Sequence, residues 1–377
     1  MGADFLLYLN FCKMSKDDFA HDAIGNSVLF VQDEHSQLSL DGYNFAVIGI
    51  PDSRNALNND GCDKAPDIIR QNFYVLNNHF ENIKIVDLGN VKQGKTIEDT
   101  YAAAKTVINS LLKMKLFVII LGGSNDMLYA NYLAYEEMRQ MVNITSVDSR
   151  FDLSDDGQHI DSQSYFNKII AHSPNYLFDY SVIGYQSYYV NKKSIELMDS
   201  LNFDTYRLGV ARSNMADVEP SIRNSDIVSI DMSSVKSSDA PANAYSSPNG
   251  FSGDEICTIT RFVGCSDKVS SVGIYEYNPS LDIDLRTAKL IGQMLWYLVD
   301  GYNVRTGELP NKDSKKFIKY HVNSTAFTQG GIVFYKSKQT DRWWMEVECP
   351  DELKARYSPQ MLVSCSYNDY LTASNNS

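Results

Sequence analysis

The sequence is poor in cysteine and histidine, and it contains no long apolar run. Its six cysteines are scattered without Cys-x-x-Cys spacing, which in a chain of 377 residues is typical of reduced thiols and argues against a disulfide framework or a zinc site. No stretch of about 20 apolar residues occurs, so we expect no membrane span. Asp4 stands where a secretory signal would carry positive charge. These absences favour a cytoplasmic protein.

Positive charge is also scarce. The 34 lysines and arginines are outnumbered by 47 aspartates and glutamates, which gives a net charge of -13. A duplex nucleic acid or an anionic membrane needs a basic face, so we expect neither as a partner. The sequence also lacks a nucleophile elbow, a Ser-His-Asp arrangement and a glycine-rich phosphate loop beside its acidic residues. Small molecules and proteins stay open as partners.

Apolar, β-branched runs alternate with amphipathic stretches along most of the chain. We predict strands at residues 45–50, 84–89, 116–121, 142–147, 180–185, 204–208, 226–231 and 269–275, and a last helix at 285–302. This alternation predicts an α/β fold, doubly wound, with a mostly parallel sheet and helices on both faces. We divide the chain into an N-terminal extension (1–43), an α/β domain (44–305) and a C-terminal extension (306–377).

The C-terminal extension has a different residue pattern from the α/β domain. A charged linker at 311–316 precedes two alternating runs, 331–335 and 343–347, which predict a small β-hairpin. Trp343 and Trp344 are adjacent and must point to opposite faces of a strand, so at least one should pack on the main domain or on a partner. Two interpretations stay open: a tail packed on the main domain, or a surface for a protein partner.

Acidic residues follow two of the predicted strands. Asp148 and Asp152 come directly after one strand, and Asp231 ends another. Because the carboxyl ends of parallel strands open into a common crevice, these three carboxylates can converge there. Carboxylate oxygens suit hard cations such as Mg²⁺ or Mn²⁺. The alternative is that they cap helices or lie in solvated loops.

Six short sequence blocks follow one another between residues 45 and 302. They are Ile48-Gly49-Ile50-Pro51 with Pro66-Asp67-Ile68-Ile69-Arg70, Gly122-Gly123-Ser124-Asn125, Asp148-Ser149-Arg150-Phe151-Asp152, Ser229-Ile230-Asp231-Met232-Ser233, Ala240-Pro241 with Pro248-Asn249-Gly250-Phe251-Ser252, and Glu276-Tyr277-Asn278-Pro279. In this order they resemble the ureohydrolase superfamily of arginase, agmatinase and formimidoylglutamase. The resemblance is closest to formimidoylglutamase-like proteins of Bacteroidota, and it implies an arginase-like fold.

The resemblance also implies a metal centre in which two Mn²⁺ ions share a hydroxide that attacks an amidine or guanidinium carbon. By the family pattern, two histidines and four aspartates hold the ions. Asn125 and Arg150 stand here at the histidine positions, and Ser233 stands at the position of the fourth aspartate. Arginine does not deprotonate near neutral pH and cannot be a ligand, so a full binuclear site is not expected.

One ion is compatible with the residues that are left. The resemblance implies that no metal or a single divalent ion, manganese or magnesium, is held by four oxygen donors: Asn125, Asp148, Asp152 and Asp231. We hypothesise that Arg150 replaces the second ion and forms charge-assisted hydrogen bonds with the aspartates. The alternative is that Arg150 turns to solvent while Asp148 pairs elsewhere.

Glu276 resembles the glutamate that recognises the substrate in this family. Its alternative role is that of a surface or helix-capping carboxylate. The candidate catalytic residues are therefore Asp148, Glu276 and Arg150. No histidine falls in the matched blocks, and His159 and His172 lie nearest to loops that could cover the crevice.

Two functions are consistent with this sequence. The first is a non-catalytic binding, scaffold or regulatory protein that descends from the ureohydrolases and whose site is neutralised by Arg150 and Lys236. A small amidine or guanidinium ligand and a protein partner at the C-terminal extension stay open. The second is a metal-dependent hydrolase of linear amidine C–N bonds with one metal or a rearranged site. The resemblance further suggests a homo-oligomer.

Overall fold

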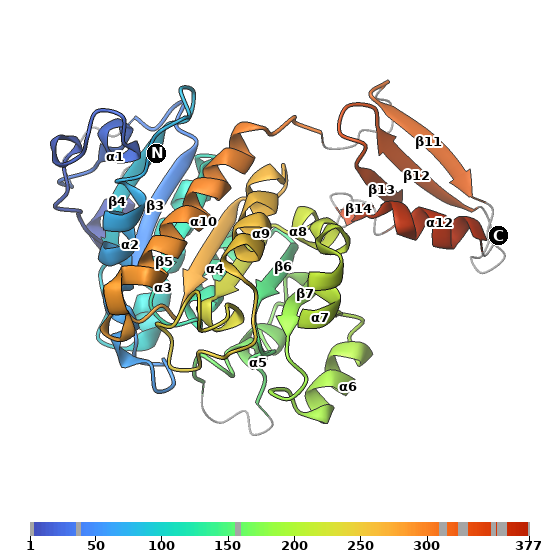
Figure 1. Ribbon diagram of the computed structural model, residues 1–377, viewed down its shortest axis with the longest axis horizontal. Coiled ribbons are helices and arrows are strands. Elements are labelled where there is room, and N and C mark those ends of the chain that lie inside the picture. The colour runs from blue at the N-terminus through green and yellow to red at the C-terminus, as the bar shows by residue number, and fades with distance from the viewer. Residues whose placement is uncertain are drawn as a thin grey trace.

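The computed structural model describes residues 4–34, 39–154, 160–308, 315–322, 331–347, 352 and 360–375. Its main sheet has ten strands in the order β1-β4-β3-β5-β10-β9-β6-β7-β8, with β2 also paired to β4 (Figure 1). These strands are β1 (Leu9–Asn10), β2 (Leu29–Phe30), β3 (Phe45–Ile50), β4 (Ile85–Val91), β5 (Phe117–Gly122), β6 (Val142–Val147), β7 (Leu177–Tyr185), β8 (Asp204–Arg207), β9 (Ile227–Asp231) and β10 (Ser271–Tyr275).

Helices connect these strands. They are α1 (Ile24–Ser27), α2 (Ala65–Phe73), α3 (Ile97–Lys113), α4 (Met127–Glu137), α5 (Phe166–Ile170), α6 (Lys192–Ser200), α7 (Leu208–Ser213), α8 (Glu219–Arg223), α9 (Gly253–Cys265) and α10 (Arg286–Asn303). Short 3-10 turns lie at Asp4–Tyr8, Lys16–Asp18, Asp60–Lys64, Met215–Asp217, Met232–Ser234, Pro279–Leu281 and Ile283–Leu285.

Local sequence signals explain where several helices begin. Thr96 caps α3 and Ser252 caps α9, each through a capping box with an acidic side chain three residues later. Pro66 lies in the first turn of α2, where a missing backbone N–H costs nothing.

The bounds of the strands and of α10 agree to within a few residues with the predicted strands and with the predicted helix at 285–302. These predictions are confirmed.

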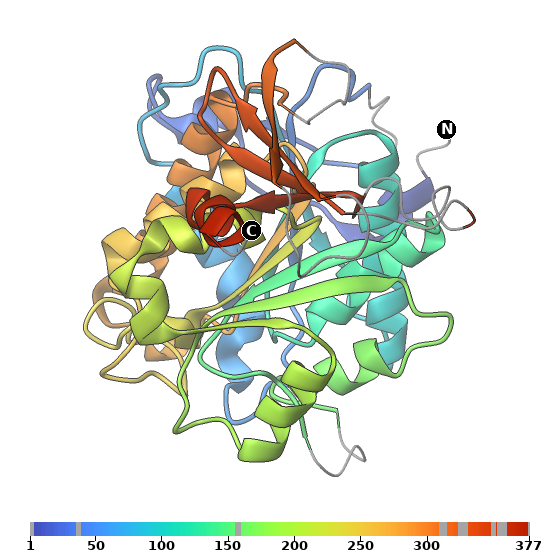
Figure 2. The same cartoon turned by 90° about the vertical axis from the view of Figure 1, so that its right-hand side faces the viewer.

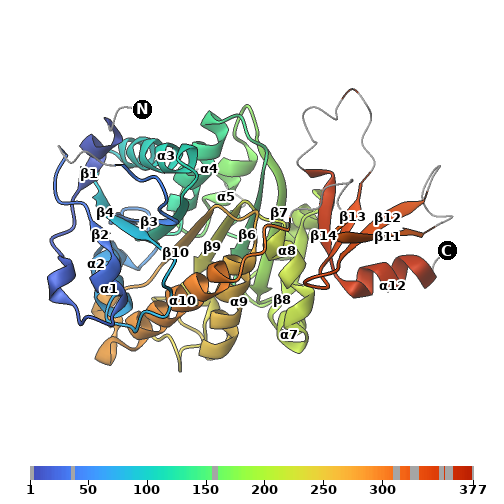
Figure 3. The ribbon, with the colours of Figure 1, turned by 90° about the horizontal axis from the view of Figure 1, so that it is seen from above.

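The sheet divides the core into two layers. Helices α2, α9 and α10 cover one face, where their apolar residues form one buried cluster with the sheet. Helices α3, α4 and α5 cover the other face and form a second cluster (Figure 3). Strands β2 to β10 pair in parallel, and only β1 runs antiparallel to its neighbour β4. The predicted doubly wound, mostly parallel sheet is confirmed.

A second sheet lies in the C-terminal part. It is antiparallel and four-stranded, in the order β11 (Phe317–Val322), β12 (Ile332–Ser337), β13 (Trp343–Glu346) and β14 (Leu362–Cys365). Helix α12 (Tyr367–Asn375) follows it. Figure 2, viewed from this end, shows the sheet in front of the α/β domain. The predicted hairpin is confirmed as β12 and β13, whereas β11, β14 and α12 were not predicted.

Helix α8 of the α/β domain fastens this second sheet. Arg223 donates from Nη1 to the carbonyl of Trp343 (3.1 Å) and from Nη2 to the carbonyl of Cys365 (3.2 Å). Its guanidinium carbon lies 4.5 Å from the ring centre of Trp344, so this tryptophan packs on the main domain, as predicted. No helix among the described residues is long and apolar enough to cross a membrane.

Candidate functional site

Four neighbouring strands bring the predicted site residues together. In the order of the sheet, β5, β10, β9 and β6 lead at their carboxyl ends to Asn125, Glu276, Asp231 and Asp148. Gly123 lets the ends of β3 and β5 approach, because a Cβ at this position would lie 2.2 Å from the carbonyl oxygen of Asp52. The convergence expected from parallel strand ends is therefore present.

The side chains enclose a narrow cavity of about 10 Å³, roughly the room of one water molecule. It is lined by Asp148, Arg150, Asp152, Ser162, Gln163, Asp231, Ser233, Asn243, Tyr245 and Glu276. All four acidic residues are at most 7% exposed. The alternative that the aspartates lie in solvated loops is therefore wrong, whereas the alternative of a capping role holds for Asp231, whose side chain caps the 3-10 turn at Met232–Ser234.

Asn125 joins two of the aspartates. Its Nδ2 donates to Asp152 Oδ2 (2.9 Å) and to Asp148 Oδ2 (3.3 Å), while its Oδ1 accepts from the hydroxyl of Ser229 (3.1 Å). The amide oxygen of Asn125, which we expected to bind a metal ion, therefore faces away from the carboxylates. The reason is electrostatic, since an amide N–H is attracted to a carboxylate that an amide oxygen would repel.

Burial dominates the ionisation of the aspartates. It raises the pKa of Asp148 and of Asp152 well above the ordinary value, and the charge of a neighbouring aspartate raises both further. Burial also raises the pKa of Asp231 to about 6, although hydrogen bonds from Ser233 oppose the rise. The backbone N–H groups of Arg150 and Ser233 each donate to one of these carboxylates, at 2.9 Å and 2.6 Å.

Glu276 is held inside the site and does not lie on the surface. Its Oε1 accepts from the backbone N–H of Asn125 (2.9 Å) and its Oε2 from Nδ2 of Asn59 (2.7 Å). Burial, followed by the charge of Asp231, raises its pKa to about 8. Glu276 and Asp152 have φ angles of +63° and +51°, in the left-handed region that non-glycine residues enter only at a cost. The interpretation of Glu276 as a surface carboxylate is wrong, whereas its bond to the backbone N–H of Asn125, just before α4, is compatible with a capping role.

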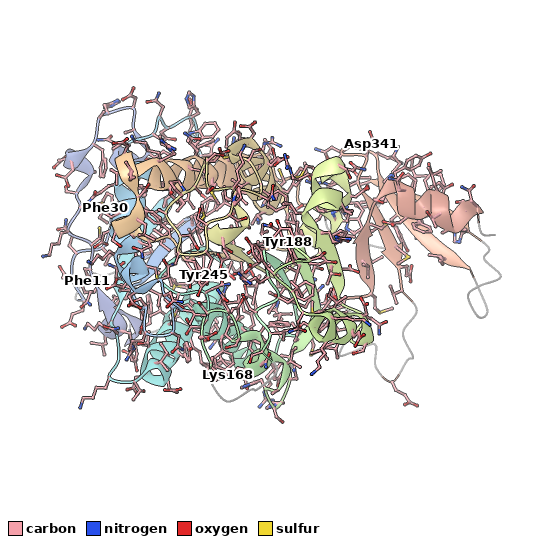
Figure 4. The ribbon with its side chains drawn as sticks, turned by 60° about the horizontal axis from the view of Figure 1, so that its bottom comes forward. Phe11, Phe30, Lys168, Tyr188, Tyr245 and Asp341 are labelled. Atoms are coloured by element: carbon pink, nitrogen blue, oxygen red, sulfur yellow. The ribbon has the colours of Figure 1, made fainter. Side chains whose placement is uncertain are left out.

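Arg150 does not form the expected fork with the aspartates. Its Nη1 donates to the carbonyl of Tyr189 (3.3 Å), and its guanidinium carbon lies 4.4 Å from the ring centre of Tyr189 and 5.5 Å from that of Tyr245. Figure 4 labels Tyr245 in the middle of the α/β domain, near Tyr188. No ion pair joins Arg150 to a carboxylate in the described part of the chain. The tyrosine rings attract the guanidinium, which explains the difference.

Arg150 nevertheless does not point away into solvent. It lines the cavity, its Nε is buried without a hydrogen-bond partner among the described residues, and its charge lowers the pKa of Asp148 and Asp231 against the larger effect of burial. The hypothesis of direct bonds is therefore wrong, but a fixed positive charge does stand beside the carboxylates.

Two of the positions at which the resemblance implies metal ligands carry side chains with other contacts. The hydroxyl of Ser233 is hydrogen-bonded to that of Ser149 (3.0 Å), and Arg150 lines the same cavity. Across the described ranges, no three His, Cys, Asp or Glu side chains are arranged to hold a metal ion. A single ion at Asn125, Asp148, Asp152 and Asp231 stays a prediction, which requires the amide of Asn125 to rotate so that Oδ1 faces the carboxylates.

Several contributors to the site carry no sequence signal. Asn59, Tyr189 and Tyr245 hold Glu276 and Arg150 in place, yet they are ordinary loop residues in the sequence. Ser229, which bonds to Asn125, does belong to a matched block, but the block gave it no role. His172 lies elsewhere, with Nδ1 at 3.1 Å from the hydroxyl of Tyr129 and Nε2 at 3.1 Å from Glu136. His159 falls outside the described residues.

Comparison with known proteins agrees with the fold. A formimidoylglutamase of Staphylococcus haemolyticus is 26% identical over 289 residues, which cover 72% of this chain and 91% of the relative. The crystal structure of Trypanosoma cruzi formiminoglutamase with Mn²⁺ has a TM-score of 0.65 at 20% identity and covers 72% of this chain and 97% of its own. The crystal structure of Bacillus subtilis formimidoylglutamase has a TM-score of 0.66 at 17% identity, and the match covers 80% of this chain and 98% of the other.

The matched segment contains every residue of the cavity. Residues 43–300 match the sequence model of the Arginase family, which leaves the C-terminal sheet outside the match. Since the fold, the order of the motifs and this match agree, the chain belongs to the arginase family.

Proposed function

We propose that this arginase-family chain does not act as a binuclear manganese hydrolase and serves as a non-catalytic binding, scaffold or regulatory protein. The proposal is supported above all by Arg150, which lines the cavity of the four acidic residues and whose charge lowers the pKa of Asp148 and of Asp231. At an effective dielectric near 20, a unit charge about 4 Å from a divalent ion repels it by several kcal/mol. The second ion of the family would meet this repulsion.

The carboxylates are stabilised in ways that need no second ion. Asn125 donates to Asp148 and Asp152, Ser233 donates to Asp231, and the raised pKa values of these acids allow some of them to be protonated. A similar structure was solved with Mn²⁺, which supports a divalent ion at this site. Because Arg150 adds a positive charge beside the carboxylates, we propose that this chain binds at most one such ion.

Metal content tests the proposal directly. Protein purified with Mn²⁺ and then dialysed should contain at most one ion per chain by mass spectrometry of the metal. The triple variant Asn125→His, Arg150→His, Ser233→Asp should hold more, because it restores nitrogen and carboxylate ligands. Two ions per wild-type chain would contradict the proposal.

An activity assay distinguishes the remaining alternative. With Mn²⁺ present, the wild-type chain should not hydrolyse formimidoylglutamate. Hydrolysis that Glu276→Gln abolishes would instead show an amidine hydrolase with a rearranged site. A small ligand with an amidine or guanidinium group, a homo-oligomeric state and a cytoplasmic location are further proposals that the family resemblance supports.

A further inference from the structure

A groove far larger than the site cavity lies between the α/β domain and the C-terminal sheet. Its volume is about 640 Å³, within the range of ligand pockets, and it shares no residue with the carboxylate cavity. One wall comes from residues 214–223 and the other from β11–β14 and the start of α12. Asp341, which lines the groove, lies where the second sheet meets the domain (Figure 4). Pockets of this size often lie at such junctions.

Aromatic rings form one side of the groove. Trp343 lies at the centre, with ring centres of Tyr370, Tyr320 and Tyr367 at 4.7, 5.1 and 5.5 Å. Tyr367 forms the outer end of this aromatic series and is 53% exposed. No leucine, isoleucine, valine or methionine lines the groove within the described part of the chain. An aliphatic or lipid ligand would therefore find few matching contacts.

The charges of the groove are paired with one another. Lys336 lies 2.7 Å from Asp341, and Glu219 lies 3.0 Å from Arg223 and 3.5 Å from Arg342. Asp217 accepts a hydrogen bond from Asn368 (3.3 Å). The lining contains three basic side chains and three acidic ones, so the groove has no net charge that would attract a strongly ionic ligand.

Neutral hydrogen-bonding groups are left over. Among the described residues, the side chain of Asn214 and the hydroxyls of Tyr320, Tyr367 and Tyr370 have no hydrogen-bond partner. An amide and a phenol each donate and accept, which suits a ligand with several hydroxyl groups. The flat C–H faces of a pyranose ring stack on aromatic rings of this kind.

From these features we propose that the groove binds a neutral glycan, with a sugar ring stacked on Tyr367 and its hydroxyls bonded to Asn214 and to the hydroxyl of Tyr320. This binding site goes beyond the proposed function of the carboxylate cavity. Most of its second wall lies outside residues 43–300, which match the Arginase family, so the site depends on the extension that this chain adds.

Binding of the full chain to an array of neutral and charged oligosaccharides tests the proposal, followed by titration calorimetry with the best neutral binder. Tyr367→Ala and Asn214→Ala should each weaken binding about tenfold, because each removes one face or one hydrogen bond of the site. Tyr297→Ala, on an exposed tyrosine of α10 outside the groove, should leave binding unchanged. Melting temperatures of the variants should equal that of the wild type.

Three results would overturn the proposal. These are no binding to any neutral glycan at about 1 mM, binding to charged glycans only, and binding that Tyr367→Ala and Asn214→Ala leave unchanged. Metal content and amidine hydrolysis do not enter this experiment, so its outcome is independent of the test of the proposed function.

Discussion

Asn125 and Arg150 supply N–H donors and a positive charge where the resemblance implies histidine ligands. The amide of Asn125 contacts two carboxylates directly, whereas the guanidinium of Arg150 acts through its charge from between two tyrosine rings. The two residues thus stabilise one acidic cluster in different ways, and their substitution should have different consequences.

Asn125→Asp should destabilise the metal-free protein by about 3 kcal/mol at neutral pH, because it replaces a shared donor with another buried acid. Urea unfolding in the presence of a chelator measures the change. Asn131→Asp is a matched control, since Asn131 is buried but bonds to the hydroxyl of Ser271 and to no carboxylate. Adding Mn²⁺ should reduce the difference, and equal losses in the two variants would contradict the prediction.

Glu276 predicts a pH dependence of stability. Its pKa rises from an ordinary 4.5 to about 8 in the folded chain, so the folded state binds more protons between these values. Its contribution to stability is complete below about 4.5 and is lost as the pH rises through about 8, by up to about 1.4 kcal/mol per unit of pH. Glu276→Gln should flatten this part of the curve of unfolding free energy against pH, measured without metal.

Glu255 is a control, because its pKa is lowered in the folded chain whereas that of Glu276 is raised. Burial raises its pKa, but hydrogen bonds from Ser252 and Arg212 outweigh burial and lower it overall. Its contribution is therefore lost as the pH falls below its ordinary range, and Glu255→Gln should change only the acidic side of the curve. A Glu276→Gln curve parallel to that of the wild type would refute the assignment.

Helix α8 is one of the elements that link the second sheet to the α/β domain, beside the bonds of Gln360 and Arg342. It is only one turn and a half long, yet Arg223 at its end reaches β13 and β14 through two carbonyls and one indole ring. Glu219, one turn earlier, holds the guanidinium of Arg223 in place (3.0 Å). Only a planar guanidinium, which carries several N–H donors and a permanent charge, can bond to both carbonyls and also stack on the ring of Trp344.

Arg223→Lys should loosen the second sheet, because an ammonium cannot reach both carbonyls while covering Trp344. Hydrogen exchange of β13 and β14 should become about 10 to 100 times faster, while exchange in β9 and β10 stays unchanged. Arg212→Lys is the control, since Arg212 is exposed and pairs only with Glu255. Equal exchange in wild type and Arg223→Lys would contradict this role of α8.

The whole molecule has separate cores. The two large apolar clusters of the α/β domain include no residue beyond Tyr302, whereas Phe317, Phe334, Trp343 and Trp344 belong to two small clusters of their own. The division at residue 306 stays a prediction, but it falls between these clusters.

A chain that ends at residue 305 should therefore fold cooperatively. Far-ultraviolet circular dichroism should show the helices of the α/β domain, and urea unfolding should show a loss of a few kcal/mol, because Arg223 loses its carbonyl and ring partners. A truncated chain without a cooperative transition would mean that the two parts form one core.

The strands and the acidic half of the site could be predicted because their signals are local. Each buried strand is a continuous apolar run, and Asp148, Asp231 and Glu276 follow such runs directly. Strands β11 and β14 were missed, because burial does not alternate along either of them: β11 buries only its two end residues and β14 only its last two. Their pairing depends on neighbours that no local pattern describes.

The α/β layering and the convergence of the acidic residues followed from local sequence patterns, since parallel strands that alternate with helices must open at one edge. The contacts of Arg150 and Asn125 in the site could not be predicted in this way. The direction of Arg150 depends on Tyr189 and Tyr245, and the orientation of Asn125 on Ser229, all brought near from distant parts of the chain. Long polar side chains choose among many rotamers, and that choice follows from contacts made after the chain has folded.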